Sequence, residues 1–438
     1  MPANVRLIID KLMERGYEAY IVGGCVRDSM LGKEPDDWDI TTSAQPCEIK
    51  RVFSRTVDTG IAHGTITVLI GGTGTEVTTY RIDGEYEDNR HPTSVEFTTN
   101  IAKDLKRRDF TINAMAYNDQ KGLVDLYGGM EDLSRQTIRC VGEPRARFGE
   151  DALRILRAVR FAAQLGFTIE KETCKAIQEL AYTLKNISAE RIQTEVVKLL
   201  VSARPGMWKD TWEMGITKVI MPEFDEMMVT QQNTPYHMYS VGEHTLKVLE
   251  NVRADKILRM AALLHDVGKP VMRTTDAKGI DHFKRHSEAG EKIARDILKR
   301  LKFDNDTLNI VSRLIRWHDL RPQADEVSVR RAIHKMGDDI FPYFIELQYG
   351  DIMGKSEYDR DEKIILNSKI RGTYLKIKEE GQCISLKGLA ISGKDLIELG
   401  IKPGPDMGKA LSEALEEVLV EPEKNNKEYL IEKIKGRT

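Results

Sequence analysis

The chain has 438 residues, of which 41% are hydrophobic and 31% are charged, and its formal net charge is −3. This length exceeds one ordinary hydrophobic core, so we expect several domains, and the composition is typical of a soluble, helix-rich protein. The charge balance excludes a uniformly basic protein, although a nucleic-acid binder needs only a local basic surface.

The sequence shows no signal peptide, membrane span or C-x-x-C pair, and from this we expect a cytoplasmic protein. The amino-terminal segment MPANVRLIIDKLMERG carries charges throughout and has no uninterrupted apolar core of the signal-peptide kind. No stretch reaches the apolar length of a membrane span. The five cysteines form no C-x-x-C pair, which predicts reduced thiols and a cytoplasmic protein; they are Cys25, Cys47, Cys140, Cys174 and Cys383.

The first hundred residues alternate strand and helix signals, which predicts an α+β domain. We expect a helix over 4–15 that ends at Gly16 and a helix near 46–53. We expect strands over 18–22, 37–41, 65–70, 75–81 and 95–99.

The segment 21–42 carries a glycine pair, Gly23-Gly24, followed by two aspartates, Asp37 and Asp39. Carboxylates two residues apart on a strand point to the same face. Mg²⁺ takes carboxylate oxygens and keeps positions open for phosphates, and a glycine pair lets backbone N–H groups approach an anion. Together they predict a nucleoside triphosphate and Mg²⁺ site, whereas an isolated D-x-D would be read as a polar turn.

The order GGxVRD, then DxDI, resembles the opening motif of the class II nucleotidyltransferases, which include bacterial CCA-adding enzymes and poly(A) polymerases. The resemblance implies that Asp37 and Asp39 are catalytic ligands of two Mg²⁺ ions. It also implies that Gly23, Gly24 and Arg27 contact the triphosphate.

The strand over 75–81, TEVTTYR, places Glu76, Thr78 and Tyr80 on one face by alternation. Glu76 would then be a third catalytic carboxylate beside the two aspartates, and the alternative is an edge-strand glutamate. The polar segment 81–92 is predicted to be a mobile loop. By the resemblance, relatives that add only C are reported to lack a working version of this loop. Because the loop is retained here, addition of A is compatible with the sequence.

The segment 106–114 reads KRRDFTINA, and its arginines suit phosphate oxygens or a charged turn. RRDFTxNA resembles the second motif of the same family, which implies that Arg108 contacts the triphosphate. The segment 124–133 ends the sheet domain, and the resemblance marks it as a hinge between head and neck.

A long helix is predicted over 148–167, with Asp151 and Arg154 three residues apart on one face. They would form an ordinary salt bridge or a base-reading pair. Cytosine and adenine both show an amino donor beside a ring-nitrogen acceptor, which a carboxylate and a guanidinium match, whereas guanine and uracil show the reverse order. The helix resembles the EDxxRxxR motif, whose Asp and Arg recognise the incoming base. We therefore place Asp151, Arg154, Arg157 and Arg160 in the nucleotide site.

The next helix begins near Ser188, a predicted N-cap. ERIxxE follows, and by the resemblance we take Glu190, Arg191 and Glu195 as structural. Prolines between 204 and 236 indicate a domain boundary near Pro235.

A second cluster of histidines and aspartates follows in segments predicted to be helical: His244, His265-Asp266, His286, His318-Asp319 and Asp351. Such clustering indicates metal binding. The order resembles the HD phosphohydrolases and implies His244, His265, Asp266 and Asp351 as ligands. His286 and His318 would fit an extended form with a second divalent transition metal. The alternative is a degenerate HD fold that serves as scaffold.

The tail from about 356 is predicted to be helical, with Gly393, Gly400 and Pro-Gly-Pro at 403–405. Its turns would either present N–H groups to a phosphate chain or simply pack as a hairpin. It resembles the C-terminal part of CCA-adding enzymes.

The resemblance spans nearly the whole chain and implies an α+β fold: a polymerase-β-like nucleotidyltransferase sheet domain followed by all-α domains. We expect a head (1–140), a neck that recognises the base (141–200), a body or linker (201–236), an HD domain (237–355) and a tRNA-binding tail (356–438).

The function implied is template-independent addition of C, C and A to the tRNA 3′ end from CTP and ATP by two-metal nucleotidyl transfer. The HD domain would remove 2′- or 2′,3′-cyclic phosphates. The alternatives are a poly(A) polymerase or a CC-adding enzyme; TGIAHGT at 59–65 resembles CCA-adding enzymes rather than the GRRFRL of poly(A) polymerases. A non-catalytic RNA scaffold would have lost Asp37, Asp39 or Arg108. An HD phosphohydrolase with a delivering head stays open, as does the oligomeric state.

Overall fold

The computed structural model describes residues 1–84, 94–233 and 239–436. Most of the loop predicted over 81–92, and the boundary predicted near Pro235, lie outside the described residues. The chain forms two compact units, Met1–Pro222 and Glu223–Thr438.

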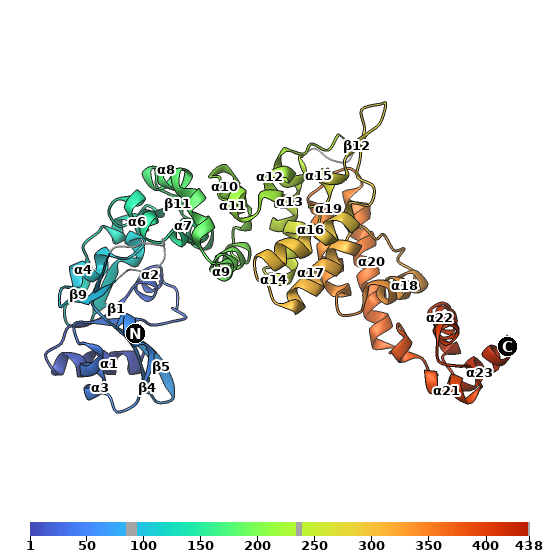
Figure 1. The fold of residues 1–438 in the computed structure, drawn as a ribbon, viewed down its shortest axis with the longest axis horizontal. Coiled ribbons are helices and arrows are strands. Elements are labelled where there is room, and N and C mark those ends of the chain that lie inside the picture. The colour runs from blue at the N-terminus through green and yellow to red at the C-terminus, as the bar shows by residue number, and fades with distance from the viewer. Residues whose placement is uncertain (85–93, 234–238, 437–438) are drawn as a thin grey trace. The chain divides into compact units, whose positions relative to one another are not determined.

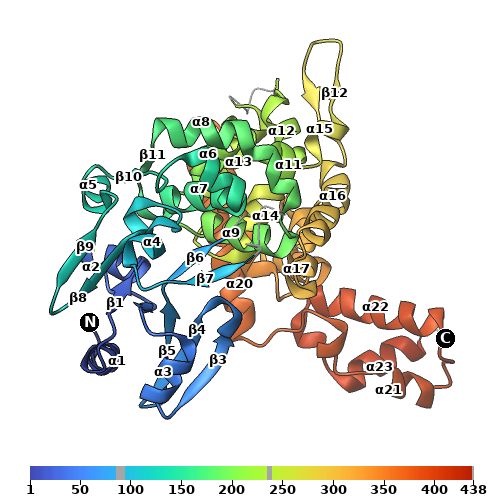
Figure 2. The same ribbon diagram turned by 60° about the vertical axis from the view of Figure 1, so that its left-hand side comes forward.

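The first unit is built on one seven-stranded sheet with the strand order β3-β4-β5-β2-β1-β8-β9 (Figures 1 and 2). Its strands are β1 (Ala19–Val22), β2 (Ile40–Thr42), β3 (Thr56–Gly60), β4 (Thr65–Ile70), β5 (Thr73–Thr79), β8 (Met115–Asn118) and β9 (Gly122–Asp125). The pairing of β2 with β5 is parallel, and the other neighbours are antiparallel. Two small sheets pair β6 (Arg81–Asp83) with β7 (Val95–Phe97) and β10 (Thr137–Ile138) with β11 (Thr168–Ile169).

The predicted strands are close to the observed ones, with two differences that affect the site. The strand predicted over 37–41 begins only at Ile40, so Asp37 and Asp39 lie in the loop before β2. β5 ends at Thr79, and Tyr80 is buried instead of sharing the face of Glu76. β3, β8 and β9 were not predicted, because these short strands carry Gly, Asn and Thr without a clear apolar alternation.

The helices of the first unit are α1 (Ala3–Glu14), α2 (Gly24–Met30), α3 (Pro46–Val52), α4 (Ile101–Lys106), α5 (Gly129–Ser134), α6 (Pro144–Glu150), α7 (Leu153–Leu165), α8 (Lys171–Leu180), α9 (Ala189–Leu200), α10 (Trp208–Glu213) and α11 (Thr217–Ile220), with short 3₁₀ turns η1 (Ile61–His63), η2 (Thr111–Asn113), η3 (Ala181–Asn186) and η4 (Pro205–Met207).

The prediction of a single helix over 148–167 is wrong, because the structure has two helices, α6 and α7, in this region. Asp151 is extended, with φ −140° and ψ 104°, and separates α6 from α7. Its carboxylate accepts a hydrogen bond from the N–H of Leu153 at 3.0 Å, as a capping residue does. Ser188 stands at the predicted N-cap position of α9, but its side chain makes no capping hydrogen bond.

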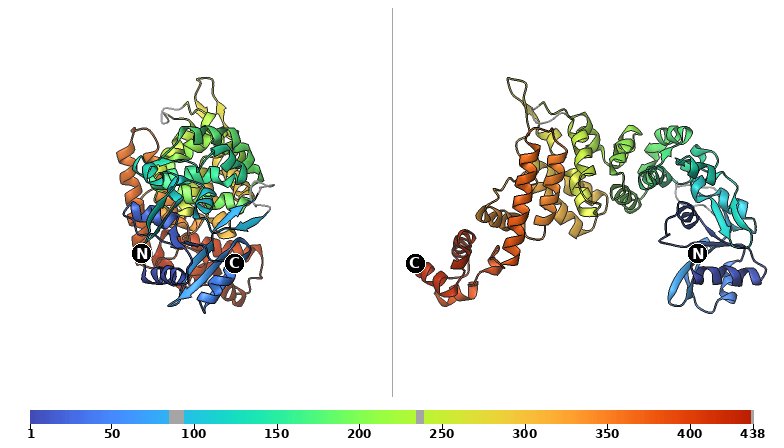
Figure 3. Two further views of the ribbon diagram at one scale, coloured as in Figure 1. Left: turned by 90° about the vertical axis from the view of Figure 1, so that its left-hand side faces the viewer. Right: turned by 180° about the vertical axis from the view of Figure 1, so that it is seen from behind.

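The second unit is helical apart from one small hairpin (Figure 3). Its elements are α12 (Pro222–Val229), whose first residue closes the first unit, α13 (Val241–Glu250), α14 (Lys256–Leu264), α15 (Lys269–Met272), β12 (Thr274–Thr275), β13 (Asp281–His282), α16 (His286–Arg300), α17 (Asn305–Trp317), α18 (Glu326–Met336), α19 (Phe341–Met353), α20 (Arg360–Glu379), η5 (Leu386–Gly388), α21 (Gly393–Glu398), α22 (Pro405–Val420), η6 (Pro422–Lys424) and α23 (Lys427–Lys435).

Two cores stabilise this unit. The apolar helix α14 is buried from Leu258 to Leu264 and packs against α13, α17 and α19. The tail has its own core, in which Leu396, Leu415 and Leu430 meet.

All five cysteines are free thiols. Within the described residues, no helix combines the length and the apolar character that a membrane crossing requires.

Candidate nucleotide site and candidate metal centre

Three acidic side chains gather where β2 begins. β2 and β5 run parallel with Ile40 beside Val77, so the same register sets Asp39 beside Glu76. Asp39 is exposed, but the surrounding protein partly desolvates its carboxylate and raises its pKa; Arg108 opposes this rise, whereas Glu76 and Asp37 add to it. Carboxylates that repel one another in this way are stabilised by a divalent cation, so the chemistry of these side chains suits a metal ion, although their oxygens do not all lie within 4.8 Å of one another.

Arg108 faces these carboxylates across a glycine. A Cβ on Gly23 would lie 2.9 Å from the Nη1 of Arg108, and the φ of Gly23 is +83°, so both space and backbone conformation call for glycine. The Nη2 of Arg108 lies 3.8 Å from the Oδ2 of the fully buried Asp104. No described residue accepts a hydrogen bond from the buried Nε of Arg108. The guanidinium is therefore held close to Asp104 and Gly23, and its positive charge suits an anion.

Arg27, predicted to contact the triphosphate, is committed to internal contacts. Its Nη1 donates to the Oδ1 of Asn113 at 2.7 Å, and its Nε and Nη2 donate to Asp28 at 2.8 and 2.9 Å. Its guanidinium also lies 5.1 Å from the ring centre of Phe161, which belongs to α7. Arg27 thus links the first motif, the second motif and α7.

The arginines of α7 also have partners in the structure. Arg157 donates from Nε and Nη2 to the Oδ2 of Asp109 at 2.8 and 2.6 Å. Burial alone would raise the pKa of Asp109, but Arg157 and Asn113 outweigh it and hold that pKa well below its usual value. The Nε of Arg160 donates to Glu195 at 2.5 Å, and its guanidinium lies 3.8 Å from the ring centre of Phe161.

The predicted base-reading pair is oriented by neighbours. Asp151 accepts hydrogen bonds from Arg191 at 2.7 and 3.3 Å, and Arg154 donates to Glu150 at 2.5 Å. The plain salt bridge that three-residue spacing suggests is replaced by these two pairs, because the chain is extended at Asp151. Arg191 and Glu195, taken as structural, do contact Asp151 and Arg160.

Sequence reasoning missed three residues that connect the site: Asp109, Asn113 and Phe161. The first two stand inside RRDFTxNA, so their place in a motif was a usable signal. Phe161 gave no signal, because an aromatic residue on an amphipathic helix reads as ordinary core.

In the second unit, six side chains converge to form what we call the HD centre: His244, His265, Asp266, His286, His318 and Asp351. Two sets of three lie with all ligand atoms within 4.8 Å of one another, and Asp266 belongs to both. Its Oδ2 lies 3.2 Å from the Nε2 of His265 and 3.7 Å from that of His244. Its Oδ1 lies 3.4 Å from the Nε2 of His286 and 3.5 Å from that of His318. Asp351 completes the first side, 3.1 Å from His244.

Each histidine of the HD centre is oriented by a backbone carbonyl. The Nδ1 atoms of His265, His286 and His318 lie 2.8, 2.8 and 2.7 Å from the carbonyl three residues earlier in the chain. The Nδ1 of His244 lies 3.1 Å from the carbonyl of Gly354. A proton on Nδ1 leaves the Nε2 lone pair toward the centre, as metal-binding histidines require.

The histidine segments are less helical than predicted. His265 and Asp266 lie in the turn after α14, and His318 follows the last residue of α17. At the end of a helix the last backbone carbonyls have no N–H partner within the helix. The carbonyl three residues before the histidine is therefore available to the imidazole. Asp319 is exposed and pairs with Arg321 at 3.1 Å, so it is not one of the six converging side chains, although it lines the same pocket.

Charge and burial suit metal ions and a phosphate. Burial lowers the pKa values of His244 and His318, which favours the neutral form that binds metal. Burial would raise the pKa of Asp266, but His265 and Lys269 hold it well below the usual range. The centre opens into a pocket of about 300 Å³ lined also by Lys269, Lys284, Arg285 and Lys355.

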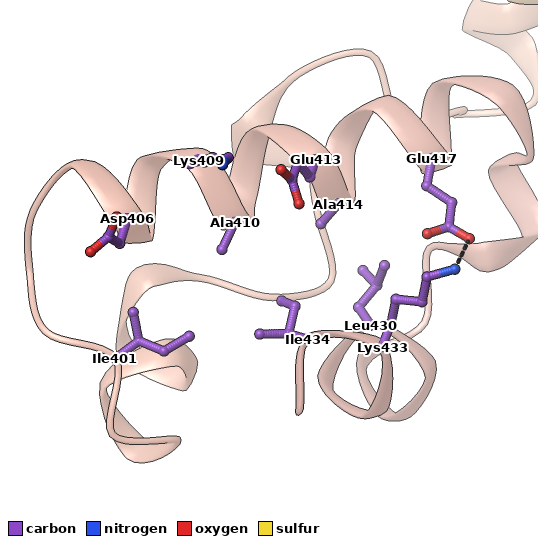
Figure 4. A pocket seen from close by; sticks show the side chains of 10 residues that line it. All are labelled: Ile401, Asp406, Lys409, Ala410, Glu413, Ala414, Glu417, Leu430, Lys433 and Ile434. Atoms are coloured by element: carbon purple, nitrogen blue, oxygen red, sulfur yellow. Dashed lines mark hydrogen bonds and ion pairs between the residues drawn. The ribbon is translucent and has the colours of Figure 1, made fainter. Parts of the chain in front are cut away.

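The tail contains a pocket of about 230 Å³ between α22 and α23 (Figure 4). Ala410, Ala414, Leu430 and Ile434 form its apolar part. Its charged residues are Asp406, Glu413, Glu417, Lys409 and Lys433, and Lys433 pairs with Glu417 at 3.2 Å. With acidic groups in excess, this pocket does not suit a phosphate chain.

Comparison with known protein families divides the chain into three matches. The Poly A polymerase head domain matches residues 19–139. The family described as the probable RNA and SrmB-binding site of polymerase A matches 166–228, and the HD domain matches 234–364.

Curated relatives match almost end to end. The chain is 35% identical over 426 residues to a CCA-adding enzyme of Levilactobacillus brevis, covering 97% of this chain and 96% of the relative. It is 36% identical over 424 residues to a CCA-adding enzyme of Limosilactobacillus fermentum, covering 94% and 92%.

Solved structures agree. The Bacillus stearothermophilus CCA-adding enzyme in complex with CTP has a TM-score of 0.72 at 28% identity, covering 100% of this chain and 99% of that one. The Thermotoga maritima CCA-adding enzyme complexed with tRNA has a TM-score of 0.61 at 22% identity, covering 99% and 94%, and shows the fold alone.

Proposed function

The chain belongs to the family of CCA-adding enzymes, and from this premise we propose that it adds C, C and A to the tRNA 3′ end at Asp37 and Asp39. The predicted family, the α+β fold class and the tRNA nucleotidyltransferase activity are confirmed by relatives that match over nearly the whole chain. The observation that carries the assignment of the site is the convergence of Asp37, Asp39 and Glu76 opposite Arg108.

Nucleotidyltransferase and HD domains use divalent metal ions, and we propose Mg²⁺ for the head, held by Asp37 and Asp39 with Glu76 as a further ligand. When bound, such ions activate the attacking hydroxyl and neutralise the triphosphate. In this proposal the positively charged guanidinium of Arg108 binds triphosphate oxygens. Gly23 and Gly24 let the backbone approach the same anion, and Arg27 supports the site through Asn113.

The incoming base is read by Asp151 and Arg154 in this proposal. Asp151 accepts from the amino group of cytosine or adenine while Arg154 donates to the ring nitrogen. Arg191 and Glu150 hold the two groups until the nucleotide arrives. Arg157 and Arg160 position α7 through Asp109 and Glu195. They therefore support the nucleotide site indirectly, without contacting the nucleotide.

A pyrophosphate-release assay tests the head, with CTP and a tRNA that lacks its terminal CCA. Asp39→Asn is expected to lower the rate by at least a hundredfold, since a ligand of the metal is lost. Asp36→Asn, an exposed carboxylate in the same loop, is the matched control and should keep the wild-type rate. Equal rates in Asp39→Asn and wild type would contradict the assignment.

We propose that the HD centre hydrolyses 2′- or 2′,3′-cyclic phosphates at damaged RNA ends. Its two ligand sets, which share Asp266, fit two divalent transition-metal ions, and such ions supply an activated water. Lys269, Lys284 and Lys355 attract the phosphate, and Asp351 is held in place by Lys355 at 2.6 Å.

A tRNA that ends in a 2′,3′-cyclic phosphate tests this second activity. Opening of the ring is expected in the wild type and in Asp37→Ala, and it should be lost in His265→Ala. A His265→Ala protein that opens the ring as fast as the wild type would refute the proposal, and the scaffold alternative would replace it.

We propose the following roles for the domains. The head (1–140) and neck (141–200) act on nucleotides, the HD domain (237–355) follows the body (201–236), and the tail (356–438) contacts tRNA. A tRNA substrate and five free thiols favour action in the cytoplasm.

A further inference from the structure

A second pocket lies beside the HD centre and has no role in the activities described so far. Its volume is about 530 Å³, within the range of about 300–1,000 Å³ usual for small-molecule sites. Lys355 lines both this pocket and the pocket of the HD centre, so the two are neighbours. Arg321 and Lys355 both contact the Oδ2 of Asp351, at 3.2 and 2.6 Å, and form the border between the two pockets.

The walls are apolar on two sides. Ile352 comes from the last turn of α19, and Leu366 comes from α20. Asp359 and Lys363 also line the pocket. A slot with apolar walls between two helices suits a flat ring, which is the shape of a nucleobase.

Two buried amides line the slot: Gln348 on α19 and Asn367 on α20, which are 6% and 7% exposed. Asn367 also lines a neighbouring pocket beside Ile345. The amide nitrogen of Gln348 donates to the carbonyls of His318 at 3.3 Å and Leu320 at 2.5 Å. The amide nitrogen of Asn367 donates to the carbonyl of Ile345 at 3.2 Å. Because a carbonyl only accepts hydrogen bonds, these contacts fix which end of each amide is nitrogen.

The oxygens of both amides are left as acceptors. No described residue donates a hydrogen bond to the Oε1 of Gln348 or the Oδ1 of Asn367. Neither oxygen is among the unpaired side-chain atoms that are completely inaccessible to solvent. A ligand with amino donors therefore completes them. Adenine, cytosine and guanine carry an exocyclic amino group, whereas uracil offers a single ring N–H between two carbonyls.

We propose that this pocket is a subsite for the base of the nucleoside whose phosphate is bound at the HD centre, and that it prefers amino-bearing bases over uracil. The proposal rests on the proposed HD function and names its substrate class as a nucleoside 2′- or 2′,3′-cyclic phosphate. The phosphate lies among the lysines of the HD centre, the sugar passes Arg321 and Lys355, and the base enters between Ile352 and Leu366.

Photocrosslinking of the full chain tests this subsite, with 8-azidoadenosine 2′-monophosphate in the presence of EDTA and peptide mapping of the adduct. We expect labelling within residues 348–370. Adenosine and cytidine 2′-monophosphates should compete at concentrations at least fivefold lower than uridine 2′-monophosphate, and inorganic phosphate should compete poorly. An oligoribonucleotide that ends in adenosine 2′-phosphate identifies the source: competition as strong as that of the mononucleotide indicates an RNA end, and weaker competition indicates a free nucleotide.

Leu366→Trp fills the slot and should reduce this adduct at least tenfold. Ile365→Trp is the matched control, because Ile365 is 54% exposed on the same helix and does not line the pocket. Asn367→Leu is a second variant, should Leu366→Trp fail to fold, and it should weaken competition by the adenosine and cytidine nucleotides relative to the uridine nucleotide. Labelling only in residues 1–222, or equal competition by uridine 2′-monophosphate, would overturn the proposal.

The two proposals fail separately. Labelling in EDTA does not depend on hydrolysis, so an HD centre without phosphohydrolase activity would leave the labelling pattern intact. Conversely, a wild type that opens cyclic phosphates at equal rates and affinities for all four bases would retain the HD function and lose the base subsite.

Discussion

Arg157 donates two hydrogen bonds, at 2.8 and 2.6 Å, to one carboxylate oxygen of Asp109. The residues lie 48 positions apart, and their contact joins helix α7 to the segment that carries Arg108. Asp109 also accepts from the side-chain nitrogen of Asn113 at 3.1 Å, and Asn113 in turn accepts from Arg27. One buried network therefore fixes helix α7 relative to the seven-stranded sheet.

Replacing Asp109 with Asn should destabilise the first unit by about 2–3 kcal/mol, because Arg157 loses its charged partner in a largely buried position. Chemical denaturation followed by circular dichroism measures the loss. Asp119→Asn, which removes an exposed pair with Arg6, is the control and should change stability by well under 1 kcal/mol. Equal stability of Asp109→Asn and wild type would show that the network is not a structural link.

The same pair predicts a pH dependence. The pKa of Asp109 is lower in the folded protein than its unfolded value of about 4, so its stabilisation is complete above that value and is lost as the pH falls toward the folded pKa. The stability difference between wild type and Asp109→Asn should therefore be constant from pH 8 to 6 and shrink below about pH 4. A difference that grows on acidification would contradict this sign.

Gly23→Ala should raise the KM for CTP at least tenfold. The added Cβ would lie 2.9 Å from Arg108 at a backbone φ of +83°, so the guanidinium must move from its position beside Asp39. Gly32→Ala is the matched control: its φ is +70°, but no atom lies within 4 Å of the new Cβ. It imposes backbone strain without displacing Arg108, and steady-state kinetics of the two variants separates these effects.

Metal content should follow the two ligand sets. After dialysis with Mn²⁺ or Ni²⁺ and gel filtration, we expect two transition-metal ions per chain in the wild type, about one in His286→Ala and close to none in Asp266→Ala. The last value follows because Asp266 belongs to both sets. His334→Ala, at an exposed helical histidine, should retain both ions. One ion in the wild type and none in His286→Ala would point to a single shared site.

Arg191→Met should weaken the choice of base without removing any group that contacts nucleotide. Asp151 would lose the hydrogen bonds of 2.7 and 3.3 Å that orient it. We expect kcat/KM for CTP to fall about tenfold, while that for UTP stays unchanged, in competition assays with a tRNA that lacks CCA. Lys198→Met, at an exposed position on the same helix, should leave the CTP to UTP ratio at its wild-type value.

The residues that carry the proposed chemistry could be predicted from the sequence, whereas the hydrogen-bond partners of several of them could not. Short motifs such as Gly23-Gly24 and the HD residues stand out because their residue types and spacing are unusual, and the structure brings the six HD residues together. The break at Asp151 was missed because hydrophobic periodicity continues across it. The contacts of Arg27 with Asn113 and of Arg157 with Asp109 could not be predicted, since both depend on tertiary structure rather than on local spacing.

The amides Gln348 and Asn367 show the same limit. Each is an ordinary polar residue on a helix. Only the packing of α19 against α20, and the carbonyls of His318 and Ile345, reveal which atoms stay unpaired. Buried polar groups of this kind are identified by their partners, which a sequence does not list.

Sequencing of tRNA 3′ ends tests the central claim most directly. A tRNA that ends at the discriminator base is incubated with Mg²⁺ and all four triphosphates, with wild-type protein or Asp37→Ala. We expect ends that stop after C-C-A with the wild type and unextended ends with Asp37→Ala. Long A tails, C-C without A, or C-C-A addition by Asp37→Ala would contradict it.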